Sequence, residues 1–179
     1  MNQSGSSNGF TVIELVVVIV LIGIVSVVVI PRFLAPNAFD EIAARDGLIA
    51  TVRAAQQAAL GRNPVTFEIN TAGGDWIFEA KSGSNVIRSF EVPTRSVILE
   101  TGSPTASANT CANDFDTPVH ANFELLFSEK GDLKTFTNDA APISVDSSFN
   151  GVRICLNDTV ENSVCVSPAG YAFAGSCDG

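Results

Sequence analysis

Apolar residues fill positions 10–30, where only Thr11, Glu14, Gly23 and Ser26 interrupt a run of 21 residues. As a helix this run would be about 31 Å long, at 1.5 Å per residue, which matches the hydrocarbon core of a bilayer. The pattern therefore predicts a transmembrane helix. A carboxylate in hydrocarbon costs several kcal/mol, so a plain membrane anchor leaves Glu14 unexplained.

A second helical pattern occupies positions 38–62 and predicts an amphipathic helix. Asn37 is the predicted N-cap, and Gly61 before Pro64 is typical of a helix end. An interfacial membrane helix, the alternative, would carry more Lys and Arg on its polar face. The apolar stripe that we expect to pack on a sheet consists of Phe39, Ile42, Ala43, Ile49, Val52, Ala59 and Leu60.

Beyond position 63 the pattern changes to short strands separated by Gly, Ser, Asn or Pro. The predicted strands cover 65–69, 75–80, 85–92 and 96–100, two hairpins within 122–137 and 151–167, and a last strand at 171–175. "TAGGD" and "KSGSN" predict hairpin turns, and positions 101–120 predict a long exposed loop. We expect an α+β fold, in which the C-terminal half of a long N-terminal helix packs on an antiparallel head over 63–179.

Proline inside a helix removes one backbone hydrogen bond and clashes with the carbonyl four residues back. Pro31 lies at the end of the apolar run, and Gly23 lies eight positions before it. The sequence therefore predicts either a simple kink or local melting between Gly23 and Pro31.

Cys111, Cys155, Cys165 and Cys177 all lie after position 110. An even number beyond a membrane segment predicts two disulfides in an oxidising compartment, with four buried thiols as the alternative. If the last hairpin turns at Val160, Cys155 lies across from Cys165 on one face, which leaves Cys111 for Cys177. Four cysteines allow three pairings, so the other two stay open.

The charge balance argues against a nucleic-acid partner. Ten Lys and Arg against nineteen Asp and Glu give a net charge of −9, which repels phosphate backbones. The chain has no C-x-x-C motif, one histidine (His120), and no P-loop, G-x-G-x-x-G or H-E-x-x-H motif. We therefore expect no metal site, no cofactor and no Ser–His or Cys–His catalysis.

"GFTVIEL" followed by "VVVIVLIGIVSVVVIPRF" resembles the class III signal of type IV pilins and type II secretion pseudopilins. The resemblance implies that residues 1–9 are a leader, that a prepilin peptidase cuts between Gly9 and Phe10, and that the new amine of Phe10 is methylated. It also implies unwinding between Gly23 and Pro31 in an assembled filament. One departure is that this leader has no Lys or Arg, whereas most leaders of the family carry one.

The family's glutamate corresponds to Glu14, which lies four residues after Phe10, about 6 Å along a helix. An axially shifted neighbour could place its Phe10 ammonium beside Glu14, which would relieve the penalty on an unpaired buried charge. We therefore expect both residues to act in assembly; the alternative is that Glu14 reaches the lipid headgroups. The resemblance implies other pilin subunits, the peptidase, an inner-membrane platform and an ATPase as partners.

Two further resemblances concern the role within this family. "FELLFSEKGDLKTF" with "GVRICLNDTVENSVCVSPAGYAF" is similar to GspH/FimT-like minor pilins and pseudopilins, and "ELVVVIVLIGIVSVVVIPRFL" to subunits of the mannose-sensitive haemagglutinin (MSHA) pilus. They imply a minor pilin in the bacterial inner membrane, with its head in the periplasm, that later joins a pilus or periplasmic filament. A major pilin, a pseudopilin and a membrane-anchored ligand-binding protein are the alternatives.

Overall fold

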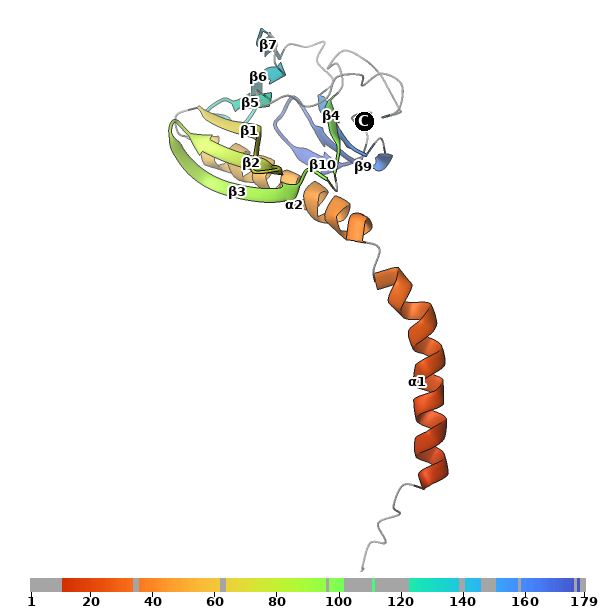
Figure 1. Ribbon diagram of the computed structural model, residues 1–179. Coiled ribbons are helices and arrows are strands. Elements are labelled where there is room, and N and C mark those ends of the chain that lie inside the picture. The colour runs from red at the N-terminus through yellow and green to blue at the C-terminus, as the bar shows by residue number, and fades with distance from the viewer. Residues whose placement is uncertain are drawn as a thin grey trace, which may run out of the picture. The chain divides into compact units, whose positions relative to one another are not determined.

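The computed structural model describes residues 11–33, 36–61, 64–95, 97–101, 111, 123–138, 141–145, 151–157, 159–175 and 177. The chain divides into two compact units, residues 1–36 and 37–179. The first contains the helix α1 (Val12–Phe33), and the second contains almost all of α2 (Pro36–Ala59) and every strand that the structure describes (Figure 1).

The strands of the second unit form two antiparallel sheets. The six-stranded sheet has the order β3-β2-β1-β5-β6-β7. Its strands are β1 (Val65–Ala72), β2 (Asp75–Ser82), β3 (Asn85–Pro93), β5 (Phe123–Phe127), β6 (Leu133–Asn138) and β7 (Ile143–Ser144). The four-stranded sheet, ordered β10-β9-β8-β4, consists of β4 (Leu99–Thr101), β8 (Val152–Leu156), β9 (Thr159–Val166) and β10 (Ala172–Ala174). The predicted α+β fold with an antiparallel head is confirmed.

Local turn signals placed the first hairpins correctly. Ala72 pairs with Asp75 and Ser82 with Asn85, so each connection is a two-residue turn within "TAGGD" or "KSGSN". The strand predicted at 96–100 is the shorter β4, and the two-residue β7 was not predicted because so short a segment has no periodicity. The predicted loop 101–120 lies outside the described residues, apart from Thr101 and Cys111.

The core combines small helix residues with large strand residues. Trp76 of β2 holds the segment that leads into β4, because its indole Nε1–H donates to the Val97 carbonyl at 2.8 Å. Tyr171, in the turn before β10, is 65 % exposed and lies outside this core. The four largest fully buried side chains come from the strands and are Phe67, Phe78, Phe123 and Phe127.

The predicted stripe of α2 is partly wrong. Phe39, Ile42 and Leu60 are exposed, Phe39 to 60 %. The buried face is one of mainly small side chains: Ala44, Leu48, Val52, Ala55 and Ala59. Alanine is a weak hydrophobic signal, but its small side chain lets a helix approach a sheet whose aromatic residues fill the interface. α2 also begins at Pro36, one residue before the predicted cap Asn37, where the fixed φ of proline suits a first helical turn.

The close approach of α2 to the sheet explains a glycine in the middle of this helix. The Phe90 ring occupies the space that a Cβ on Gly47 would need. The hydroxyl of buried Thr51 also donates to the Gly47 carbonyl, at 2.8 Å. Gly47 is therefore retained for packing, although glycine weakens a helix.

We expect Gly47→Ala to destabilise the head by about 1 kcal/mol, because overpacking costs about 1–3 kcal/mol and exceeds the gain of about 1 kcal/mol in helix propensity. Denaturant unfolding of the full-length chain in detergent measures this change. Adding Phe90→Leu to Gly47→Ala removes the clashing ring edge and should recover most of the loss. A Gly47→Ala chain more stable than wild type would contradict the proposed contact.

Phe127 to Gly131 form an F-x-x-x-G motif, which lies where the end of α2, the β5–β6 turn and the turn before β10 meet. Gly131, in the turn between β5 and β6, has φ of +82° and lies against Gln56 of α2 and against Leu60, which follows α2. A Cβ on Gly170, in the turn before β10, would meet the Gly131 carbonyl oxygen. Gln56 Nε2 donates to the Ala169 carbonyl at 2.9 Å. The motif therefore joins the end of α2 to both sheets.

Candidate assembly and processing site

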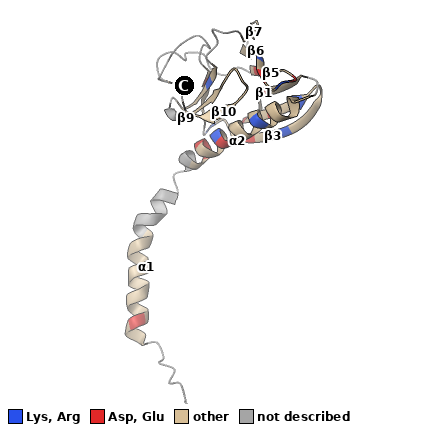
Figure 2. Ribbon diagram, turned by 180° about the vertical axis from the view of Figure 1, so that it is seen from behind, with Lys and Arg blue, Asp and Glu red and all other residues tan. Residues whose placement is uncertain are grey.

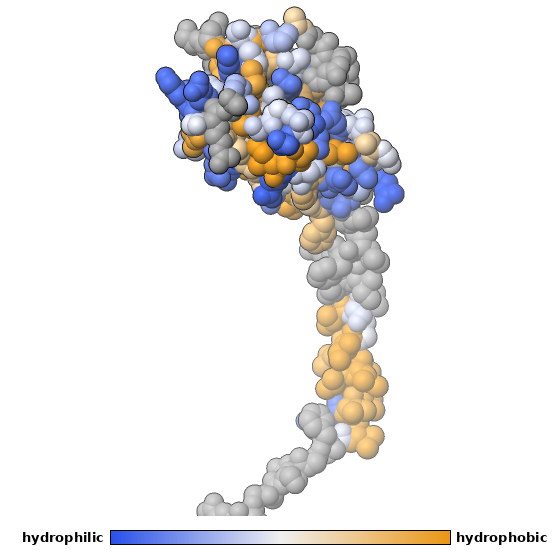
Figure 3. Space-filling model, turned by 90° about the vertical axis from the view of Figure 1, so that its left-hand side faces the viewer, coloured by the Kyte–Doolittle hydropathy of each residue, from blue (hydrophilic) through white to orange (hydrophobic). Residues whose placement is uncertain are grey.

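The described side chains of α1 form an exposed apolar surface. Val12 is 82 % exposed and Leu21 is 57 % exposed, and every residue from Thr11 to Val25 is exposed. Figure 3 shows this part of α1 as an apolar surface on the face in view. Apolar patches of this extent on a protein mark a surface that another molecule or a membrane covers.

Thr11 caps the first turn of α1. Its hydroxyl oxygen Oγ1 accepts the backbone N–H of Glu14 at 3.3 Å, and its carbonyl oxygen accepts the N–H of Leu15 at 3.2 Å. A Thr three residues before a Glu is the pattern of a capping box. Sequence reasoning missed this role of Thr11, although the T-x-x-E pattern in "TVIE" was available to indicate it.

Glu14 lies in the first turn of α1, where a negative charge interacts favourably with the helix dipole. It is the one acidic residue in the sequence of α1, and Figure 2 shows an acidic position in red near the start of that helix. Its predicted partner Phe10 and the predicted cleavage position after Gly9 lie outside the described residues, as does the leader 1–9. The pairing of Glu14 with a neighbouring subunit's Phe10 therefore stays a prediction.

Gly23 and Pro31 both lie inside α1, which is helical from Val12 to Phe33. Local melting between them, one of the two predicted outcomes, is therefore wrong for the single chain. Proline removes only one backbone bond of the helix, and Ser26 adds a hydrogen bond from its hydroxyl to the Ile22 carbonyl at 2.7 Å. A kink, and unwinding inside a filament, stay predictions.

Over the part of the chain that the structure describes, none of the helices has both the length and the apolar character needed to cross a membrane.

The head contains two disulfides, as predicted, but the predicted pairing is wrong. Cys111 is bonded to Cys155, with their Cα atoms 5.8 Å apart. Cys165 is bonded to Cys177, with their Cα atoms 5.2 Å apart. The predicted pairs Cys155–Cys165 and Cys111–Cys177 are therefore both replaced.

The register of the last hairpin explains this correction. Leu156 pairs with Thr159, so the turn lies at positions 157–158, before Val160. The register then shifts between Ile154 and Leu156. Beyond this irregularity Arg153, and not Cys155, lies directly across from Cys165. Cys155 instead lies across from Glu100 of β4 on its other side.

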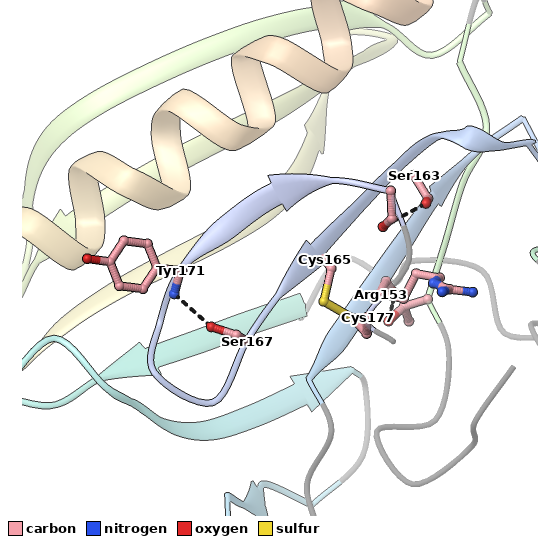
Figure 4. The surroundings of a disulfide bond; sticks show 8 residues. Arg153, Ser163, Cys165, Ser167, Tyr171 and Cys177 are labelled. Atoms are coloured by element: carbon pink, nitrogen blue, oxygen red, sulfur yellow. Dashed lines mark hydrogen bonds between the residues drawn. A yellow bond between two sulfur atoms is a disulfide. The ribbon is translucent and has the colours of Figure 1, made fainter. Parts of the chain in front are cut away.

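The C-terminal tail is held on β9 at two points. Ser163 and Gly175 exchange hydrogen bonds: the Gly175 N–H donates to the Ser163 carbonyl at 2.8 Å, and the Ser163 hydroxyl donates to the Gly175 carbonyl at 3.1 Å. The Cys165–Cys177 disulfide fixes the tail two residues further on. Figure 4 shows this disulfide near Ser163 and the buried Arg153.

Three carboxylates lie side by side on neighbouring strands of the six-stranded sheet, on the face opposite its buried face. Glu68 of β1 pairs with Glu79 of β2 on one side and with Glu124 of β5 on the other. Lys81 Nζ lies 2.8 Å from carboxylate oxygens of Glu68 and Glu79. The pKa of the Glu68 carboxyl is lowered. Burial alone would raise this pKa, but hydrogen bonds from Lys81 and Asn70 to the carboxylate outweigh the effect of burial. Burial and the charge of Glu68 raise the pKa of Glu124.

We expect Glu124→Gln to stabilise the head at pH 7 by about a few tenths of a kcal/mol. The reason is that it removes the repulsion between the Glu124 and Glu68 carboxylates, which lie directly opposite each other on adjacent strands. The raised pKa means that folded Glu124 destabilises the head only when ionised. The gain should therefore vanish as pH falls through the folded pKa of Glu124 to the unfolded value of about 4.3.

Thermal unfolding of wild type and Glu124→Gln at a series of pH values measures this difference. Glu129→Gln removes an exposed acid in the β5–β6 turn and is the matched control. A Glu124→Gln effect that is independent of pH, or destabilising at pH 7, would show that the carboxylate repulsion is absent.

The sequence predicted no metal site and no Ser–His or Cys–His catalytic site. Among the described residues, no group of three or more His, Cys, Asp and Glu side chains could hold a metal ion. His120 lies outside the described residues.

Comparison with curated proteins and with solved structures gave no match. A family model described as the prokaryotic N-terminal methylation motif matches residues 5–30. The match includes the predicted cleavage position after Gly9, the capping residue Thr11 and Glu14. The chain therefore carries, at residues 5–30, the N-terminal signal of type IV pilins and prepilins.

Proposed function

We propose that this chain is a minor pilin of a type IV pilus of the MSHA type, which joins or primes a filament through α1. The observation that carries the proposal is the match of residues 5–30 to the methylation motif. It is supported by the exposed apolar surface of α1 and by the single described carboxylate, Glu14, on that surface.

In this proposal a prepilin peptidase cuts between Gly9 and Phe10, and the new amine of Phe10 is methylated. Before assembly the apolar segment 10–30 lies in the bacterial inner membrane, and the head lies in the periplasm. The two disulfides fit that oxidising compartment.

Assembly then exchanges contacts of α1 with lipid for contacts with neighbouring α1 helices. Glu14 gains the Phe10 ammonium of a neighbour, and this charge pair sets the axial register of the subunits. Other pilin subunits, an inner-membrane platform and an assembly ATPase are the partners, while the chain itself catalyses nothing and takes no cofactor.

A major pilin and a type II secretion pseudopilin have the same N-terminal signal. We favour a minor pilin because the long polar segment 101–120 and the GspH/FimT-like tail distinguish the head. Quantifying the chain in filaments sheared from the host surface tests this role. A minor pilin is scarce there, and its deletion leaves few filaments. A dominant band would indicate a major pilin, and unchanged filaments with impaired secretion would indicate a pseudopilin.

A further inference from the structure

We propose that Thr11 is a positioning residue for processing: its cap starts α1 at Val12 and so keeps the Gly9–Phe10 bond outside the helix. This inference rests on the proposed cleavage between those two residues. Thr11 would act through the position of the helix start and need not contact the peptidase.

The hydrogen bonds at the start of α1 support a helix boundary at Thr11. The first four backbone N–H groups of a helix have no partner within it. The Thr11 hydroxyl accepts the last of these four, from Glu14, at 3.3 Å, and the ladder begins where Leu15 N–H donates to the Thr11 carbonyl at 3.2 Å. Val12 and Ile13 are apolar, so their side chains could not replace the Thr11 hydroxyl as an acceptor.

The sequence before Thr11 contains a competing cap. Asn8 is at least as good an N-cap residue as threonine, and it lies three positions upstream. A helix capped by Asn8 would include Gly9 and Phe10 in its first turn. The Gly9 carbonyl oxygen would then accept a helical hydrogen bond.

Hydrolysis needs that carbonyl to be free. Water adds to the Gly9 carbonyl carbon, the C–N bond to Phe10 breaks, and the products are a Gly9 carboxyl group and a Phe10 amine that takes up a proton. The charge that develops on the Gly9 oxygen must be stabilised by donors of the peptidase. A carbonyl engaged in a helix is less available to those donors, so a cap at Thr11 favours cleavage.

Thr11→Val tests this inference, because it replaces the hydroxyl with a methyl group of similar size. Thr11→Ser keeps the acceptor and is the matched control. In a time course with full-length chain and prepilin peptidase in membranes, we expect Thr11→Val to be cut about fivefold more slowly, the factor for loss of an N-cap. Thr11→Ser should be cut at the wild-type rate, and Asn8→Ala added to Thr11→Val should restore much of the rate.

Hydrogen exchange of the uncut chain in detergent provides a readout of the helix boundary. We expect protection to begin at Glu14 or Leu15 in wild type and Thr11→Ser, and to extend toward the N-terminus in Thr11→Val. Wild-type cleavage of Thr11→Val would overturn the inference. Slow cleavage with an unchanged boundary would also overturn it, because the peptidase would then contact the hydroxyl directly.

Failure of the proposed function gives a different result. In that case wild type itself would not be cut between Gly9 and Phe10, and the processing role of Thr11 would fall with it. A shifted protection pattern in Thr11→Val would still show that Thr11 fixes the start of α1.

Discussion

Glu14→Leu should leave the chain processed at Phe10 but reduce its incorporation into filaments by roughly 10²- to 10³-fold. The reason is that a neighbour's Phe10 ammonium would then be buried without a partner, and breaking a buried ion pair costs about 3–5 kcal/mol. Leucine also makes α1 more apolar, which favours retention in the membrane over extraction. Quantitative immunoblots of sheared filaments and of the membrane fraction measure the ratio.

Two variants control this experiment. The side chain of Asp46 on α2 is 62 % exposed. Asp46→Leu therefore removes an exposed carboxylate, and this variant should assemble normally. Glu14→Asp keeps the charge and should retain part of the incorporation. Normal filaments containing Glu14→Leu would contradict an assembly role and would favour the alternative of a membrane-anchored ligand-binding protein, for which Glu14 is dispensable.

Removal of the Cys111–Cys155 disulfide should destabilise the head by roughly 4 kcal/mol, and removal of Cys165–Cys177 by roughly 3 kcal/mol, from the chain entropy that each closed loop restricts. The first bridge closes a loop with a sequence separation of 44 and the second one of 12. The second loss is further limited because Ser163 and Gly175 still hold the tail.

Paired Cys→Ala variants, Cys111→Ala with Cys155→Ala and Cys165→Ala with Cys177→Ala, measure these losses by denaturant unfolding of oxidised chains. Peptide mapping without reduction identifies the bridges in wild type and is the control. Recovery of a Cys155–Cys165 peptide, or a larger loss for the shorter loop, would contradict the observed connectivity and its energetic consequence.

Features set by local sequence were predictable. The apolar run determined α1, and two-residue turn signals determined β1 to β3, since both depend on neighbours only. The carboxylate of Glu14 was conspicuous because such a charge is costly in an apolar segment. The cap at Thr11 is equally local, since the T-x-x-E pattern alone indicates it.

Features set by tertiary contact were not predictable. The buried face of α2 is defined by alanines such as Ala44 and Ala55, whose burial depends on aromatic residues supplied by distant strands. The predicted disulfide pairing assumed a regular hairpin that turns at Val160, whereas the hairpin turns at positions 157–158 and its register shifts between Ile154 and Leu156. The need for glycine at position 47 likewise depends on a distant strand, because the Phe90 ring of β3 lies against it.

N-terminal sequencing and intact mass of the protein recovered from its host test the central claim most directly. The proposed function predicts a chain that starts at Phe10, carries one added methyl group on its α-amine and contains two intact disulfides. A chain that retains Met1, or one that begins beyond Pro36 and so lacks Glu14, would contradict it.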